Sequence, residues 1–366
     1  HINWLIGDLV RILNMYLYIK SIHMKVKNIN KVVGPMPIRD PFILGAYHYD
    51  LYPKGNGKMG VDAELLKGKN IGQDFDRNAD WRMYHGETIP GFPHHPHRGF
   101  EIATIVEEGF ADHFDSIGSK GRYGNGDVQL MSAGSGVLHG EMFPLLNDET
   151  DNPFRLFQIW LNMHSSDKLT EPTYKMLWSE TIPQKDVKDE EGRNVNVRVI
   201  LGDYAGVKSQ DPLAHSWARD PKHHVGIALL NMDPNSSFTL PAVSETMNRF
   251  VFFYDGVDVI SIDNYKIQQR HLADLNGNEE IIIQNGNSQA KVLILEGEPI
   301  NESVAAYGPF VMNTEQEIRD AFAEYQKTQF GGWPWGDKET DIVNPKEAGR
   351  FASYNFGKEL DEPDLK

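Results

Sequence analysis

The sequence contains no cysteine among its 366 residues. This absence excludes a disulfide framework, a thiolate zinc site and a cysteine nucleophile. Any bound metal must therefore be held by histidine and carboxylate side chains. A chain without disulfides also suits a reducing compartment, so we expect a cytoplasmic protein.

Positive charge is scarce as well. The chain has 36 Lys and Arg against 52 Asp and Glu, which gives a formal net charge of -16. This charge repels a phosphate backbone and an anionic lipid surface, and no basic patch interrupts it. We expect no direct nucleic-acid or membrane binding and a monomeric chain. A protein partner with a basic surface remains compatible with this charge.

Long apolar runs are also missing. Residues 1–23 are the most apolar segment, but Asp8, Arg11 and Lys20 interrupt it, and a bilayer span needs roughly 20 consecutive apolar residues. We expect these residues to be an upstream extension or an artefact of the sequence's start. An amphipathic helix is the alternative, because the apolar positions follow a helical spacing.

Short strand-like segments dominate the chain instead. Runs rich in β-branched and aromatic residues alternate with Gly, Asp, Asn and Pro, as in 102–106, 128–131, 154–160 and 195–201. This pattern predicts an all-β protein, and the length is enough for two domains. The run 103–109 recurs weakly as 250–256, and both copies end an apolar strand at an acid-Gly turn, which favours two similar halves.

One helix is expected near the C-terminus. Thr314-Glu-Gln-Glu317 has the pattern of a capping box, and Ile318, Ala321, Phe322 and Tyr325 follow with helical spacing. We expect this helix to close the second domain. The tail beyond Phe330 is polar with scattered aromatic residues, so we expect it to pack on a domain without forming one.

Histidines gather in the stretch Gly91-Phe-Pro-His-His-Pro-His-Arg-Gly-Phe-Glu101. Side chains two apart on a strand project to the same face, so His95 and His97 can point into a barrel while His94 points away. Pro96 removes one backbone donor and fits an edge strand or a bulge. Glu101 has the same parity and is a candidate to join the two histidines.

A second pair follows the glycine-rich turn in Met131-Ser-Ala-Gly-Ser-Gly-Val-Leu-His-Gly-Glu141, where His139 and Glu141 are again two apart. Two same-face pairs make a four-ligand site, although a His-x-His pair also occurs by chance on surface loops. Imidazole and carboxylate ligands without a thiolate suit Fe(II), Mn, Ni, Cu or Zn.

These motifs resemble the signature of the pirin family. The resemblance rests on the segments His94–Glu101, Asp112–Ser116, Gly126–Gln129 and Ala133–Met142, and on Glu296–Ile300 and Tyr307–Thr314 near the end. It runs from about Met24 to Gly332. It implies a bicupin, with two cupin-type β-barrels in one chain and a single metal ion, most often iron, in the N-terminal barrel.

The resemblance also assigns ranges and ligands. It implies an extension over 1–23, a metal-binding cupin domain over 24–165, a cupin domain without metal over 166–330, and a tail over 331–366. Carried over by motif, the metal ligands are His95, His97, His139 and Glu141. Glu101 then lies outside the ligand set, as a hydrogen-bond partner of a ligand.

Two functions compete at this point. The resemblance implies a dioxygenase that acts on quercetin-like flavonols or a related small molecule, with Glu141 as the catalytic acceptor of the hydroxyl proton. The alternative is a binding protein that senses metal or redox state and regulates a protein partner. His113 is a further candidate to line the cavity, although Asp112 and Asp115 beside it favour a solvent-facing turn.

Overall fold

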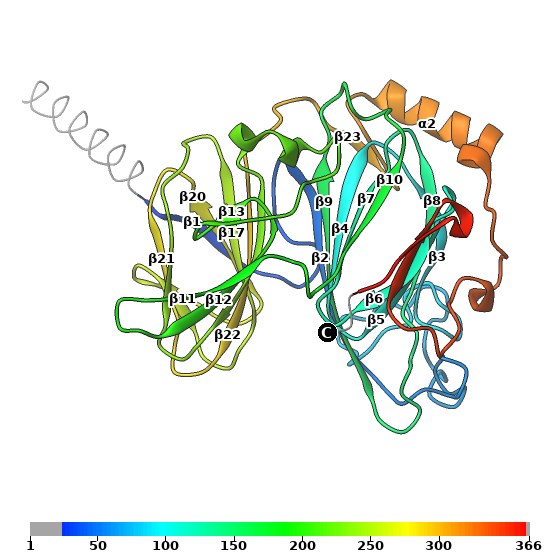
Figure 1. Cartoon of the computed structure of the whole chain (residues 1–366), viewed down its shortest axis with the longest axis horizontal. Coiled ribbons are helices and arrows are strands. Elements are labelled where there is room, and N and C mark those ends of the chain that lie inside the picture. The colour runs from blue at the N-terminus through cyan, green and yellow to red at the C-terminus, as the bar shows by residue number, and fades with distance from the viewer. Residues whose placement is uncertain (1–23, 364–366) are drawn as a thin grey trace, which may run out of the picture. The chain divides into compact units, whose positions relative to one another are not determined.

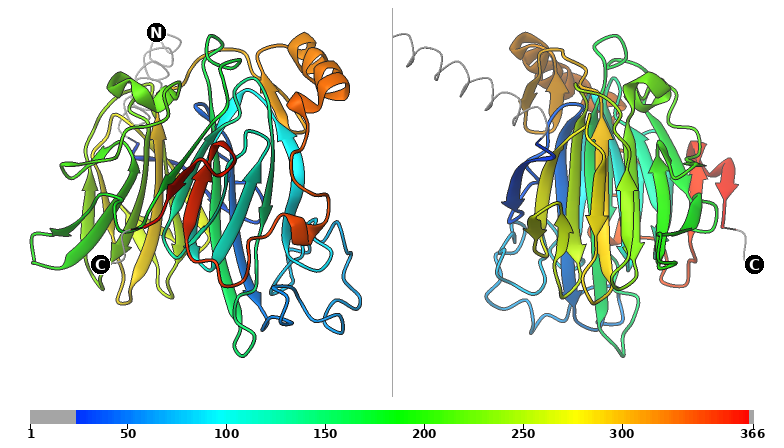
Figure 2. Two further views of the ribbon diagram at one scale, coloured as in Figure 1. Left: turned by 45° about the vertical axis from the view of Figure 1, so that its right-hand side comes forward. Right: turned by 90° about the vertical axis from the view of Figure 1, so that its left-hand side faces the viewer.

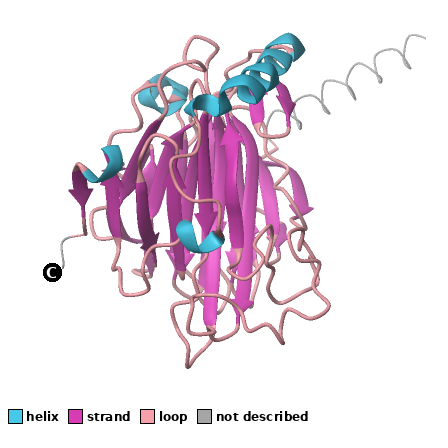
Figure 3. Cartoon of the chain, turned by 90° about the vertical axis from the view of Figure 1, so that its right-hand side faces the viewer, coloured by secondary structure: helices cyan, strands magenta, loops and turns pink. Residues whose placement is uncertain are grey.

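The computed structural model describes residues 24–363, so the expectation for residues 1–23 lies outside the described part of the chain. The described residues form two compact units. The histidine unit contains residues 33–183, 209–223 and 300 onward, and the second unit contains 24–32, 184–208 and 224–299. Strands dominate both units (Figure 1, Figure 3), which confirms the all-β expectation.

Two antiparallel sheets build the histidine unit, in the strand orders β10-β7-β4-β9-β2 and β26-β25-β6-β5-β8-β3, and β23 pairs with β24 beside them. Side chains from both sheets meet in one core, for example Val106 with Tyr123 and Phe154. The strands are β2 (Phe42–Tyr52), β3 (Gly91–His97), β4 (Phe100–Glu108), β5 (Phe110–Asp115), β6 (Lys120–Gly124), β7 (Val128–Ser132), β8 (Val137–Met142), β9 (Asn152–Asn162), β10 (Thr173–Leu177), β23 (Ala305–Tyr307), β24 (Phe310–Met312), β25 (Phe351–Tyr354) and β26 (Glu359–Asp361).

The second unit repeats this plan with the orders β1-β20-β17-β22-β15-β12-β11 and β16-β21-β18-β19. Its strands are β1 (Val26–Lys31), β11 (Gln184–Lys188), β12 (Asn194–Leu201), β13 (Asp203–Tyr204), β14 (Val207–Lys208), β15 (Gly226–Met232), β16 (Ser237–Leu240), β17 (Asn248–Asp255), β18 (Ile260–Ile262), β19 (Tyr265–Ile267), β20 (His271–Asn276), β21 (Ile281–Gln284) and β22 (Ala290–Gly297). Alternate side chains of a strand project to the same face, and on β12 this face carries Val195, Val197 and Val199 into the core.

The C-terminal helix is α2 (Glu315–Thr328), and its capping box is present as expected. The Thr314 hydroxyl accepts a hydrogen bond from the Glu317 amide, and the Glu317 carboxylate accepts one from the Thr314 amide. Ile318 and Ala321 are buried. Short 3-10 turns complete the described helices: η1 (Trp217–Arg219), η2 (Pro221–His223), η3 (Gln329–Gly331), η4 (Glu339–Asp341) and η5 (Asn355–Gly357). No helix within residues 24–363 is long and apolar enough to span a lipid bilayer.

The compact units differ from the contiguous ranges that the sequence suggested. Residues 24–32 belong to the second unit, while residues 166–183 and 300 onward belong to the histidine unit. Helix α2 therefore packs on Phe310 and Met312 of β24 instead of closing the second unit. Backbone hydrogen bonding explains why residues 24–32 belong to the second unit, because β1 pairs with β20 in an antiparallel arrangement.

The C-terminal tail packs on the histidine unit, where β25 extends one sheet by pairing with β6 (Figure 2, left, red strand). Arg122 of β6 anchors the tail. Its buried guanidinium makes two 2.7 Å hydrogen bonds to Asp112 and donates to carbonyl oxygens of the segment 344–348. One buried cation thus connects the barrel wall to the tail.

We predict that Arg122→Met lowers the free energy of unfolding of the histidine unit by about 3–5 kcal/mol, because it leaves the Asp112 carboxylate buried without its cation. The tail should also detach, which limited proteolysis with mass spectrometry would detect as cleavage beyond residue 330. Arg193→Met is the matched control, since Arg193 pairs with Asp189 at a position that is 30% exposed, and it should cost at most about 1 kcal/mol. Equal stability of the two variants would contradict this role of Arg122.

Candidate metal centre

The histidine motifs lie on two neighbouring strands. β3 is the edge strand of its sheet and pairs with β8, so that His95 stands opposite His139. Residues directly opposite each other in an antiparallel pair project to the same side, and His97 shares that side because it is two residues from His95. Local alternation and strand register together bring the three imidazoles into one cluster.

A bulge before His95 sets its orientation. The pairing of β3 with β8 is interrupted between Phe92 and His95, and the Pro93 carbonyl oxygen lies 2.9 Å from His95 Nδ1. This contact requires a proton on Nδ1 and leaves the Nε2 lone pair free. His94 turns away, as expected from its parity, and stacks on Trp333 with ring centroids 4.7 Å apart.

The three ligand atoms converge within 4.8 Å of one another. Nε2 of His95 lies 3.0 Å from Nε2 of His139. The Nδ1 atom of His97 lies 3.2 Å from the carbonyl oxygen of Pro309, in the segment before β24. The carbonyl oxygens that orient His95 and His97 therefore come from distant parts of the sequence, Pro93 and Pro309.

Burial keeps these imidazoles neutral. It lowers the pKa of His95 to about 4 and the pKa values of His97 and His139 well below the usual range, and the neighbouring imidazoles lower them further. Neutral imidazoles with free lone pairs are the form that binds a metal ion.

The donor set fits a divalent metal ion. Two nitrogen lone pairs that point toward each other repel unless a proton or a metal cation lies between them. Metal–nitrogen bonds of about 2.1 Å at right angles place two nitrogens about 3.0 Å apart, which matches the distance between His95 Nε2 and His139 Nε2. The cluster thus fits one metal ion bound by three imidazoles.

Glu141 lies next to the cluster but outside it. Its Oε2 atom is 4.0 Å from Nε2 of His139 and accepts a 2.7 Å hydrogen bond from the Gln158 amide. Thr104 donates a 3.3 Å hydrogen bond to the other carboxylate oxygen. Burial raises the pKa of Glu141, which makes its carboxyl group a better proton acceptor than an exposed one.

Glu101 faces away from the cluster, although it follows His95 and His97 by an even number of residues. The chain turns at Gly99, where φ is +86°, and enters the opposite sheet as β4. On β4 Phe100 packs on His97 with centroids 5.2 Å apart, and Thr104 also faces the site. Glu101 therefore projects from the other face, near Ser216, where burial raises its pKa to about 7.

Two residues of β9 that face the site, Gln158 and Trp160, were missed by sequence reasoning. Trp160 stacks on Phe100 at 4.2 Å and lies 5.3 Å from the His97 ring, and its indole N–H donates to Gln158 at 3.3 Å. Gln158 and Trp160 are two apart in the strand-like run 154–160, so alternation could have placed them on one face. The sequence carries no signal for which face that is.

Of the two alternatives for His113, the structure contradicts the solvent-facing turn and supports a place in the wall of the cavity. His113, Asp112 and Asp115 are all buried on β5. His113 Nε2 lies 2.9 Å from the Asp115 carboxylate, and its ring is 5.6 Å from the ring of His139. β5 pairs with β8 so that His113 stands opposite Glu141, which places His113 in the wall behind the cluster.

Among residues 24–363 this is the one cluster of three or more histidine or acidic side chains with converging ligand atoms. The interior of the second unit is filled with aliphatic and aromatic side chains such as Val251, Ile262 and Val292. His223, in the segment 209–223 of the histidine unit, stacks on Trp217 with ring centroids 3.4 Å apart.

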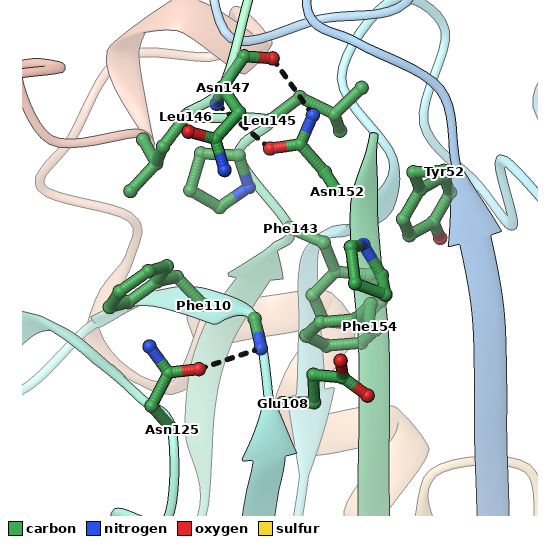
Figure 4. A pocket seen from close by; sticks show the side chains of 13 residues that line it. Tyr52, Glu108, Phe110, Asn125, Phe143, Leu145, Leu146, Asn147, Asn152 and Phe154 are labelled. Atoms are coloured by element: carbon green, nitrogen blue, oxygen red, sulfur yellow. Dashed lines mark hydrogen bonds between the residues drawn. The ribbon is translucent and has the colours of Figure 1, made fainter. Parts of the chain in front are cut away.

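The histidine unit also contains a hollow of about 210 Å³ (Figure 4). Glu108, Phe110 and Asn125 line it. Glu108 is eight residues beyond Phe100 on β4, which corresponds to about 26 Å along a strand. None of the three clustered histidines lines this hollow, so it is separate from the candidate metal centre.

Comparisons with known proteins agree with the fold and the motifs. The Pirin family model matches residues 70–161, and the model of the pirin C-terminal cupin domain matches residues 227–331. Human pirin is 34% identical over 280 residues, which cover 74% of this chain and 89% of that protein. A pirin-like protein of Solanum lycopersicum is 36% identical over 238 residues, or 64% of this chain and 75% of that protein.

Among solved structures, the quercetin 2,3-dioxygenase from Acinetobacter baumannii is similar with a TM-score of 0.65 and 26% sequence identity. The similarity covers 85% of this chain and 99% of that one. These matches confirm the expected bicupin fold with one short C-terminal helix. Together with the motifs that form the histidine cluster, they show that this chain belongs to the pirin family of the cupin superfamily.

Proposed function

We propose that the protein is a metal-dependent dioxygenase that acts on quercetin-like flavonols or a related small molecule. The observation that carries this proposal is the convergence of three neutral imidazoles beside a buried carboxylate. The similarity to a structure described as a quercetin 2,3-dioxygenase supports the choice of substrate. In this proposal His95, His97 and His139 hold one divalent ion, Fe(II), and Glu141, whose Oε2 atom lies 4.0 Å from Nε2 of His139, is the fourth ligand expected from the motif.

The bound metal would supply Lewis acidity, which lowers the pKa of a coordinated substrate hydroxyl. Glu141 accepts the proton that this hydroxyl releases. Gln158 orients the carboxylate by donating to Oε2, and the indole of Trp160 in turn donates to the Gln158 amide oxygen. The stacked rings of Phe100 and Trp160 form an apolar wall beside His97 that excludes water from this side.

We predict that protein purified without chelator or affinity metal contains about one transition-metal ion per chain, measured by elemental mass spectrometry. His95→Ala should reduce metal occupancy at least tenfold, because it removes a ligand. His94→Ala is the matched control, since His94 lies in the same motif but stacks on Trp333. Equal metal loss in both variants, or wild-type protein without metal, would refute the assigned site.

We predict that metal-loaded protein consumes quercetin under air, followed by the loss of flavonol absorbance. Glu141→Gln should lower kcat by roughly 100-fold or more, the usual effect of losing a general base. Glu101→Gln should remain within about threefold of wild type, because Glu101 projects from the opposite face of β4. Unchanged quercetin absorbance with Fe, Mn, Ni, Cu and Zn in turn would count against the activity.

A further inference from the structure

A chain of hydrogen bonds lies beside the metal centre and is not used in the proposed chemistry. His48 Nδ1 is 2.7 Å from the Tyr84 hydroxyl. Tyr84 donates a 2.7 Å hydrogen bond to Asp50 Oδ2, and Arg82 binds Asp50 Oδ1 at 2.8 Å. Tyr84 and Asp50 are buried, whereas His48 is partly exposed.

The hydrogen-bond directions determine which nitrogen of His48 carries the proton. Asp50 is held as an acceptor by Arg82, so the single proton of the Tyr84 hydroxyl goes to Asp50. Tyr84 must then accept a hydrogen bond from Nδ1–H of His48, which leaves a lone pair on Nε2. Within residues 24–363 no hydrogen bond reaches this Nε2 atom. Loss of water around the ring, followed by the charge of the nearby Arg82, lowers the pKa of His48 to about 4, so the ring stays neutral.

The strand register places His48 on the same side as the metal centre. On β2, Ala46 stands opposite Gln158 of β9, and Gln158 binds Glu141. His48 follows Ala46 by two residues, so it faces the same side about 7 Å further along the strand. The Phe92 ring is near both sites, with its centroid 6.3 Å from the ring centroids of His48 and His95.

The barrel is accessible on this side. β2 and β3 are edge strands of the two sheets, and the inward-facing residues Ala46, His48, Phe92 and Gln158 are all partly exposed, while most of the barrel interior is buried. A ligand bound at the metal can therefore extend over Phe92 toward His48.

We propose that His48 is a specificity-determining residue, whose Nε2 atom accepts a hydrogen bond from a second hydroxyl group of the substrate. Tyr84 and Asp50 hold the imidazole in the accepting tautomer, and Phe92 offers an apolar face to the ring system between the two polar ends. The preferred substrates are then aromatic compounds that carry one hydroxyl at the metal and a second hydroxyl on a pendant ring. This inference rests on the proposed function, because it assumes that a hydroxylated aromatic compound binds at the metal.

The test compares two flavonols for binding to the metal-loaded, full-length protein without dioxygen, measured by quenching of tryptophan fluorescence. Quercetin carries two hydroxyls on its pendant phenyl ring, and galangin carries none there. His48→Ala should weaken quercetin binding roughly tenfold, as expected for one lost hydrogen bond, and leave galangin within twofold. Tyr84→Phe should show the same selectivity with a smaller loss, and His48→Gln should restore part of the affinity.

Tyr49→Phe is the control for β2, since Tyr49 points to the other face and lies against Arg155, and it should change neither affinity. Metal content should be equal in all variants. Equal weakening of both flavonols by His48→Ala, or unchanged quercetin binding, would overturn the role of His48. The proposed function would not be affected by either result. If neither flavonol binds the metal-loaded wild type, the proposed function fails and the inference fails with it.

Discussion

The hydrogen-bonded register between β3 and β8 is the constraint on which the candidate metal centre depends. It sets His95 opposite His139, and alternation then adds His97 to the same face. A slip by one residue would turn every side chain of β3 to the opposite face. The bulge before His95 and the position of β3 at the sheet edge accommodate the prolines of this strand, which a central strand would not tolerate.

The buried polar atoms around the cluster come from widely separated parts of the chain. His95 is oriented by the carbonyl of Pro93, two residues away, whereas His97 is oriented by that of Pro309. The C-terminal segment therefore contributes to the candidate metal centre and belongs to the histidine unit. Lys168 strengthens this connection, because its buried ammonium group donates to the carbonyl oxygens of both Gly99 and Val311.

Local patterns in the sequence were reliable where a single element decides the outcome. The strand-like runs are strands, and the capping box at Thr314 begins α2. The unit to which α2 belongs was not predictable, because the segment that packs against it is chosen by tertiary contacts. His113 shows the same limit: its acidic neighbours suggested a solvent-facing turn, but Arg122 and backbone amides satisfy those carboxylates inside the protein.

The sequence by itself determined the all-β character, the exclusion of thiolate ligands and the two motifs that supply the histidines. These properties depend on residue type and on alternation within one strand. Only the tertiary structure decided that Glu101 turns away, that Gln158 and Thr104 hold Glu141, and that His48, Tyr84 and Asp50 form one hydrogen-bonded chain. The physical reason is that a turn such as that at Gly99 resets the alternation, and the pairing of distant strands then selects which faces meet.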